Sequence, residues 1–161
     1  MLWRLGRRLI ALFGLQSRVQ MTVTISRVLL ERIRHQAHAN YPDECCGLLL
    51  GQEAETDRFV RDIREVQNSF EGLRHNRYLI SPTDVYEAEK SAQELGLQVI
   101  GVYHSHPDHA AQPSQIDREN AIPHFSYIIM SVMNGLAGEL SCWTFAYEDV
   151  SFSRQSLLIS D

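Results

Sequence analysis

The sequence predicts a mixed α/β fold, with a sheet of six to seven strands flanked by about three helices. Three observations predict it: apolar residues at helical spacing behind capping residues, apolar runs closed by glycine, and strand-like segments separated by turn residues. At 161 residues and 18.5 kDa, the chain is long enough for one domain with a substantial core and too short for two ordinary ones. We therefore expect a single active site.

The first elements are expected to be a helix and a strand pair. A serine cap, apolar residues at helical spacing and the stop at Pro42 predict a helix over 26–39. A compact apolar run over 45–50 is typical of a strand buried on both faces. A more exposed strand over 58–66 is expected to pair with it through the polar turn at 52–57.

The rest of the chain continues the same alternation of helices and strands. A loop is expected over 67–77 and a short strand over 78–80. Ser81 caps a second helix that runs to about Leu95, with a proline in its first turn and a glycine at its end. The remaining expected elements are a strand over 97–103, a helix over 114–121 and strands over 125–132, 139–147 and 150–154.

The net charge of −5 is unevenly placed along the chain. Residues 1–20 carry four arginines and no acidic residue, which leaves 11 basic and 20 acidic residues in 21–161. This acidic body does not indicate a nucleic-acid partner. We expect 21–161 to form the single domain, and 1–20 to be a basic tail or an extension from a start upstream of Met21.

Alternatives for residues 1–20 follow from their pattern. Apolar residues at helical spacing between arginines also suit an amphipathic helix on a membrane surface or partner. A secretory signal is disfavoured because no small-x-small cleavage site follows Leu15. No apolar run approaches the ~20 residues of a membrane-spanning helix.

Cysteine usage predicts the compartment. The three cysteines include an adjacent pair, Cys45 and Cys46, and form neither a disulfide framework nor a CxxC zinc motif. We therefore expect a reducing compartment, the cytoplasm. A thiolate beside a metal is an alternative role for the pair.

Three histidines within six residues follow the strand expected over 97–103. His104 and His106 are two apart on an extended backbone, so both imidazoles project from one face and can bind the same metal ion. Asp117, at the start of the expected third helix, offers a third ligand. A fourth position left to water is typical of a catalytic zinc site rather than a structural one.

Hydrolysis at such a site also needs a base and a donor for the developing oxyanion. Glu44 stands at the mouth of a buried strand, where a charged residue is otherwise unfavourable, and it is our candidate for the base. Ser114 lies three residues before Asp117 and is our candidate oxyanion donor. Both Ser114 and Asp117 also suit helix capping, which does not exclude these roles.

These residues together resemble a known family. Glu44, then His104-Ser105-His106, seven residues, Ser114, two residues and Asp117 is similar to the pattern of the JAMM (MPN-plus) metallopeptidases. The resemblance covers about residues 22–155. It implies a zinc peptidase or isopeptidase with a cytidine-deaminase-like α/β fold and one Zn²⁺ per chain. It also implies ligands His104, His106 and Asp117, base Glu44 and oxyanion donor Ser114.

The short segments around the site indicate which members of the family the chain resembles. Residues 67–77 and 108–112 lack the insertions of eukaryotic deubiquitinases, so the chain looks like the compact prokaryotic members. The resemblance implies cleavage after the C-terminal Gly-Gly of a small ubiquitin-like sulfur-carrier protein. Release of cysteine or a short tail is the first expectation, and release of a conjugated protein the second. Arg74 and Arg77 are candidates for contact with such a partner.

Other functions share some of these residues. The run from His104 to His109 also reads HxHxDH, the dinuclear motif of metallo-β-lactamase-like hydrolases, although that fold needs a longer chain and further ligands. A zinc deaminase would need HxE and PCxxC elements, which the sequence lacks. An iron oxygenase uses the same ligand types. A catalytically inactive scaffold that binds ubiquitin-like partners is the non-enzyme alternative.

Overall fold

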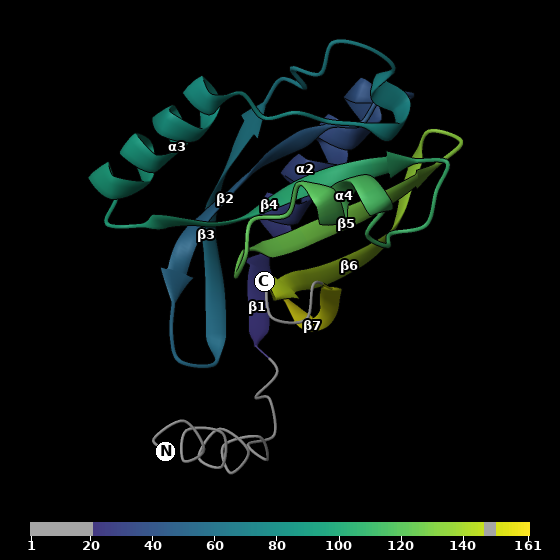
Figure 1. Cartoon of the computed structure of the whole chain (residues 1–161). Coiled ribbons are helices and arrows are strands. Elements are labelled where there is room, and N and C mark those ends of the chain that lie inside the picture. The colour runs from purple at the N-terminus through teal and green to yellow at the C-terminus, as the bar shows by residue number, and fades with distance from the viewer. Residues whose placement is uncertain (1–20, 147–150) are drawn as a thin grey trace, which may run out of the picture.

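The computed structural model describes residues 21–146 and 151–161 (Figure 1). The expectations for residues 1–20 lie outside the described residues. The described helices are α2 (Arg27–Asn40), α3 (Pro82–Glu94), α4 (Gln115–Glu119) and a 3₁₀ turn, η1 (Arg74–Asn76). The strands are β1 (Thr22–Ser26), β2 (Cys46–Glu53), β3 (Asp57–Val66), β4 (Gln98–Pro107), β5 (Ser126–Met133), β6 (Leu136–Ala146) and β7 (Ser151–Ser160). The predicted mixed α/β class is confirmed.

The seven strands form one closed sheet, in the order β1-β3-β2-β4-β5-β6-β7. The β2–β3 and β2–β4 pairs are antiparallel, and β4 pairs with β5 in parallel. β1 pairs in parallel with both β3 and β7 and so closes the sheet. The predicted pairing of the strands over 45–50 and 58–66 through a polar turn is therefore confirmed, as β2 and β3.

One strand was not predicted, and the prediction of another is wrong. β1 was not expected; it is only five residues long and owes its strand structure to partners far away in the sequence, on both sides. Residues 78–80 have no regular secondary structure and join no strand. Their backbone is satisfied differently, since Leu79 N donates to the side chain of Asn68 and its carbonyl accepts from Ser69 N.

Element boundaries differ where tertiary pairing extends or shortens a local pattern. β4 continues through the histidines to Pro107 because each residue from Gly101 to Pro107 has a partner in β5. α4 is shorter than the 114–121 expected. β6 and β7 correspond to the expected 139–147 and 150–154, with β7 prolonged by its pairing with β1. Residues 147–150, including the expected turn there, lie outside the described residues.

The core is divided between the two sides of the sheet. On one side α2 packs through Leu30 and Ile33 against strand residues that include Tyr103. On the other side α3 packs through Ala88 and Ala92 against strand residues that include Val102. Side chains alternate along a strand, so His104 and His106 lie on the same side of β4 as Val102. Figure 1 shows α4 in front of β5, which places a second element over that side.

Both long helices begin as the sequence predicts. The hydroxyl oxygen of Ser26 accepts from Leu29 N at 3.3 Å, and that of Ser81 accepts from Asp84 N at 3.0 Å. Within the described residues, the helices are too short or too polar to cross a membrane.

Candidate metal centre

The candidate site lies where β4 ends and α4 begins. β4 places His104 opposite Cys46, the first residue of β2. Glu44, two residues before β2 begins, therefore lies near the same end of the sheet. The loop after β4 brings Ser114 back to cap α4, and Asp117 follows in the first turn of that helix. The fold thus brings segments that are far apart in the sequence together at one site.

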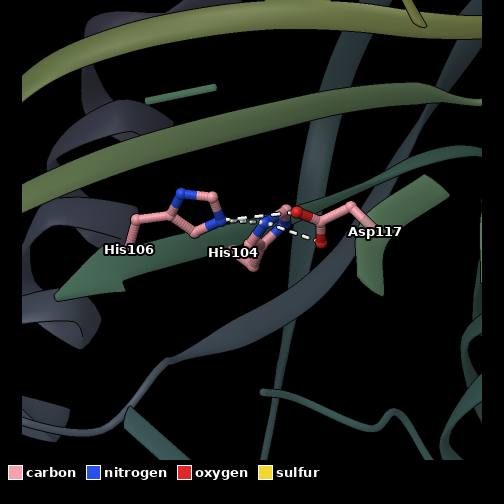
Figure 2. A group of neighbouring side chains, drawn as sticks. All are labelled: His104, His106 and Asp117. Atoms are coloured by element: carbon pink, nitrogen blue, oxygen red, sulfur yellow. Dashed lines mark hydrogen bonds and ion pairs between the residues drawn. The ribbon is translucent and has the colours of Figure 1, made fainter. Parts of the chain in front are cut away.

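The three predicted ligands form a close group (Figure 2). His104 Nε2 lies 3.2 Å from Asp117 Oδ1, and His106 Nε2 lies 3.5 Å from Asp117 Oδ2. The two Nε2 atoms are 3.0 Å apart. His104 is 0 % exposed, His106 6 % and Asp117 7 %. Two imidazoles and a carboxylate held this way, away from solvent, can bind one metal ion.

The two histidines are oriented differently. His106 Nδ1 lies 2.9 Å from the carbonyl oxygen of Ala110, which fixes Nδ1 as the protonated nitrogen and leaves Nε2 to bind a metal. His104 Nδ1 is buried and has no hydrogen-bond partner among the described residues. Burial lowers the pKa of His104 against the attraction of Asp117, which favours the neutral imidazole that metals bind.

The surroundings of Asp117 keep its carboxylate in the charged form. Its Oδ2 accepts from Ser114 N at 2.7 Å and from the Ser114 hydroxyl at 2.6 Å, within a capping box. Burial by itself would raise the pKa of Asp117. His104, His106 and Ser114 outweigh it and hold that pKa well below its usual range. The carboxylate is therefore ionised at any pH where the protein would work.

Glu44 lies on the wall of the same site. It is 5 % exposed, and its backbone N–H donates to the Arg74 carbonyl at 2.8 Å. Burial raises the pKa of Glu44 to about 8, with Asp117 adding to the rise and His106 opposing it. Such a carboxyl exchanges protons near neutral pH, as a general base requires.

Two clefts meet at this group. A polar cleft of about 630 Å³ is lined by Glu44, His106 and Ser114 among others. A more apolar cleft of about 620 Å³ reaches Asp117 from the side of α3, and its walls include Tyr78 and Val85. The two clefts share three lining residues, which are Arg77, Ile116 and Glu119. The two clefts therefore adjoin one another beside the candidate metal centre.

Three further residues lie near the site, and the sequence indicated a role for only one of them. Asn68 is buried within the expected loop and hydrogen-bonds to the backbone of Glu44, and Tyr78 stacks on His104. Arg77, a candidate for partner contact, lines both clefts. Polar and aromatic residues in a loop give no local signal of burial, so only their contacts reveal these positions.

The structure does not support a dinuclear centre on the HxHxDH run. The Asp108 carboxylate accepts from the Tyr41 hydroxyl at 3.0 Å and from Asn134 N at 2.7 Å. His109 lines the polar cleft but is not part of the His104, His106 and Asp117 group found among the described residues. One metal ion per chain is the number this arrangement supports.

The adjacent cysteines are core residues. Cys45 and Cys46 are buried, and neither belongs to that ligand group. Burial raises the pKa of the Cys45 thiol to about 11 and raises that of Cys46 further. The thiolate forms that bind metals are therefore disfavoured.

Comparison with known proteins agrees with this geometry. The family model for prokaryotic homologs of the JAB domain matches residues 26–146. A desampylase from Haloferax volcanii is 30% identical over 116 residues, which cover 71% of this chain and 81% of the relative. A probable TtuB-protein conjugate cleaving protease from Thermus thermophilus is 30% identical over 109 residues, covering 68% of this chain and 70% of the relative.

The fold and site therefore define a JAB-type domain, and the chain belongs to the prokaryotic homologs of the JAB domain. A solved structure shows the same fold: a JAB1/MPN domain protein from Archaeoglobus fulgidus, with a TM-score of 0.52 and 19% identity. The match covers 88% of this chain and 97% of that one. The recognition of the JAMM/MPN family from the sequence is confirmed.

Proposed function

We propose that the protein is a zinc-dependent peptidase or isopeptidase that cleaves after the C-terminal Gly-Gly of a small ubiquitin-like carrier protein. The observation that carries this proposal is the buried His104, His106 and Asp117 group opening on a cleft that Glu44 lines. The intact ligand set supports an enzyme rather than an inactive scaffold. The name of the Thermus thermophilus relative specifies protein conjugates. It thus favours a conjugated protein as the leaving group over the cysteine or short tail that the sequence analysis placed first.

The chain's own residues account for the steps of hydrolysis. When bound, zinc supplies a Lewis acid that lowers the pKa of water from about 15.7 toward about 7. His104, His106 and Asp117 hold it. Glu44 takes the proton from the attacking water and passes it to the leaving nitrogen. The Ser114 hydroxyl turns from Asp117 Oδ2, which keeps its bond from Ser114 N, and donates to the oxygen of the scissile carbonyl as negative charge develops there.

We assign the two halves of the proposed substrate to the two clefts. Glu44 lines the polar cleft, and it delivers its proton to the leaving nitrogen, so the leaving group lies in the polar cleft. The carrier's tail then lies in the apolar cleft, which meets the polar one beside Asp117. The direction in which the substrate runs through the site thus follows from the position of Glu44.

Cleavage of defined substrates tests the proposed function. A ubiquitin-like carrier ending in Gly-Gly is joined in one substrate to a lysine side chain of a second protein, and in another to a short linear peptide. Mass spectrometry of the products should show release after the second glycine, with the isopeptide substrate cut faster. Failure of zinc-loaded protein to cut either substrate, across a panel of such carriers, would contradict the proposal.

Arg77 is expected to help hold the substrate. It is the only lysine or arginine lining either cleft, and its guanidinium lies 5.4 Å from the centre of the Phe70 ring without an ion pair among the described residues. Arg77→Glu should raise KM about tenfold, since hydrogen bonds to charged groups contribute about 1.5–3 kcal/mol. The kcat value should change little. Arg61→Glu, on the distant strand β3, is the matched control, and an equal rise in KM there would point to a general charge effect.

Ser114 offers a test of the oxyanion role. Its hydroxyl hydrogen bonds to Asp117 in the structure, so the residue also supports a metal ligand. Ser114→Ala should lower kcat about 10²-fold or more if it serves the oxyanion. Zinc affinity, measured by competition with a chelator, should fall less than kcat. Equal losses in both would assign Ser114 to ligand support alone.

A further inference from the structure

His104 lacks the hydrogen bond that usually orients a metal-binding histidine. Its Nε2 faces Asp117 Oδ1 at 3.2 Å, so Nδ1 is the nitrogen directed away from the metal. That Nδ1 is buried without a partner among the described residues, whereas the corresponding atom of His106 meets the Ala110 carbonyl. Metal-binding histidines almost always engage this second nitrogen, because the bond sets the ring orientation. Something else must hold the ring of His104.

The ring of Tyr78 lies flat against His104. The two ring centroids are 4.6 Å apart and the planes are inclined by 27°, a stacked arrangement. Val102, the residue two before His104 on the same face of β4, lines the apolar cleft together with Tyr78. A flat face at this distance opposes rotation of the imidazole about its bond to Cβ. It therefore restricts the direction in which Nε2 points.

Tyr78 is itself fixed from both sides by Asn68, which is 5 % exposed. The Asn68 side-chain amide donates to the carbonyl of Arg77 at 2.9 Å, and its oxygen accepts from Leu79 N at 3.2 Å. The residues immediately before and after Tyr78 are thus tied to one buried side chain. The same amide donates to the Glu44 carbonyl at 3.0 Å, which couples this segment to the candidate base.

We propose that Tyr78 is a positioning residue for His104, whose ring it orients by stacking in place of a hydrogen bond to Nδ1. The proposal rests on the proposed function only in that His104 binds the metal. It assigns a role to the extended segment 77–80, which forms no strand and contributes no ligand. Asn68 holds that segment against the site.

Metal binding measures this role without a substrate. Co²⁺ and Zn²⁺ are titrated into metal-free wild type, Tyr78→Phe and Tyr78→Leu. Loss of the aromatic face should weaken metal binding about tenfold, the lower end of the effect of removing an outer partner of a ligand. Tyr78→Phe keeps the ring and should bind as wild type does. The visible absorption of bound Co²⁺ should change in Tyr78→Leu alone, because the direction of one ligand is altered.

Tyr86→Leu is the matched control, since Tyr86 on α3 is 64% exposed and lies outside the residues lining either cleft. Tyr78→Met supplies a second non-aromatic side chain of adequate volume if the leucine variant does not fold. Wild-type affinity and an unchanged Co²⁺ spectrum in folded Tyr78→Leu or Tyr78→Met would overturn the proposal. Absence of metal binding by wild type would instead overturn the proposed function, so the two failures are distinguishable.

Discussion

Replacing Glu44 with glutamine is expected to leave the metal bound and to slow cleavage by about 10²- to 10⁴-fold. Glutamine keeps the size of the side chain, but its amide cannot take a proton from water and pass it to the leaving nitrogen. Glu44 contributes no atom to the ligand group, so that group stays intact. Turnover of the isopeptide substrate and the zinc content of the purified variant are the two measurements.

The same substitution should stabilise the metal-free protein at alkaline pH. The folded-state pKa of Glu44 is about 8, above its ordinary value of 4.5. Between these two pH values the folded protein therefore binds more protons than the unfolded chain. Stability therefore falls as pH rises through this range, by up to about 1.4 kcal/mol per unit. Glutamine does not ionise, so the variant does not lose stability in this pH range. The free energy of unfolding should favour the variant on the order of 4 kcal/mol at pH 8 and show little difference near pH 4.

Glu94→Gln is the control for both measurements. Glu94, the last residue of α3, is exposed and lies outside the residues lining either cleft. The identical chemical change there should leave turnover and the pH dependence of stability near those of wild type. If Glu44→Gln cleaves at the wild-type rate, the base is another group. If its stability follows wild type at every pH, Glu44 is not buried as an ionisable group in solution.

Replacing His106 with alanine is expected to abolish both metal binding and cleavage. The ligand group has three members, and the remaining His104 and Asp117 leave too few donors for tight binding of zinc, which takes three protein ligands in its catalytic sites. Zinc content should fall from one per chain to a small fraction. In wild type a chelator should lower the unfolding temperature, because an ion that binds only the folded protein stabilises it. In the variant the chelator should have no effect.

His109→Ala is the matched histidine control. His109 lines the polar cleft but lies outside the ligand group, so this variant should retain one zinc per chain and most of its activity. A wild-type content of two, reduced to one by His109→Ala, would favour the dinuclear alternative. A His106→Ala variant that keeps its zinc would show that the ion binds elsewhere.

Much of this protein could be predicted from local sequence. The serine caps of α2 and α3 and the hairpin of β2 and β3 depend on neighbouring residues, and the structure confirms them. His104 and His106 share a face because any strand places residues two apart on one side. The residue types and spacings also indicated the family, which the comparison confirmed.

Tertiary structure decided the features that depend on distant partners. β1 exists because β3 and β7 complete its hydrogen bonds. Residues 78–80 form no strand, since Leu79 N donates to the Asn68 side chain and the Leu79 carbonyl accepts from Ser69 N. The raised pKa of Glu44 requires burial beside Asp117, 73 positions later in the numbering of the chain.

Residue identity therefore determined which chemistry is available, since ligand and base types are properties of single side chains. Only the folded chain decided the pKa of the candidate base Glu44 and the stacking of Tyr78 on His104. Burial, stacking and long-range hydrogen bonds arise when segments far apart in the sequence come together.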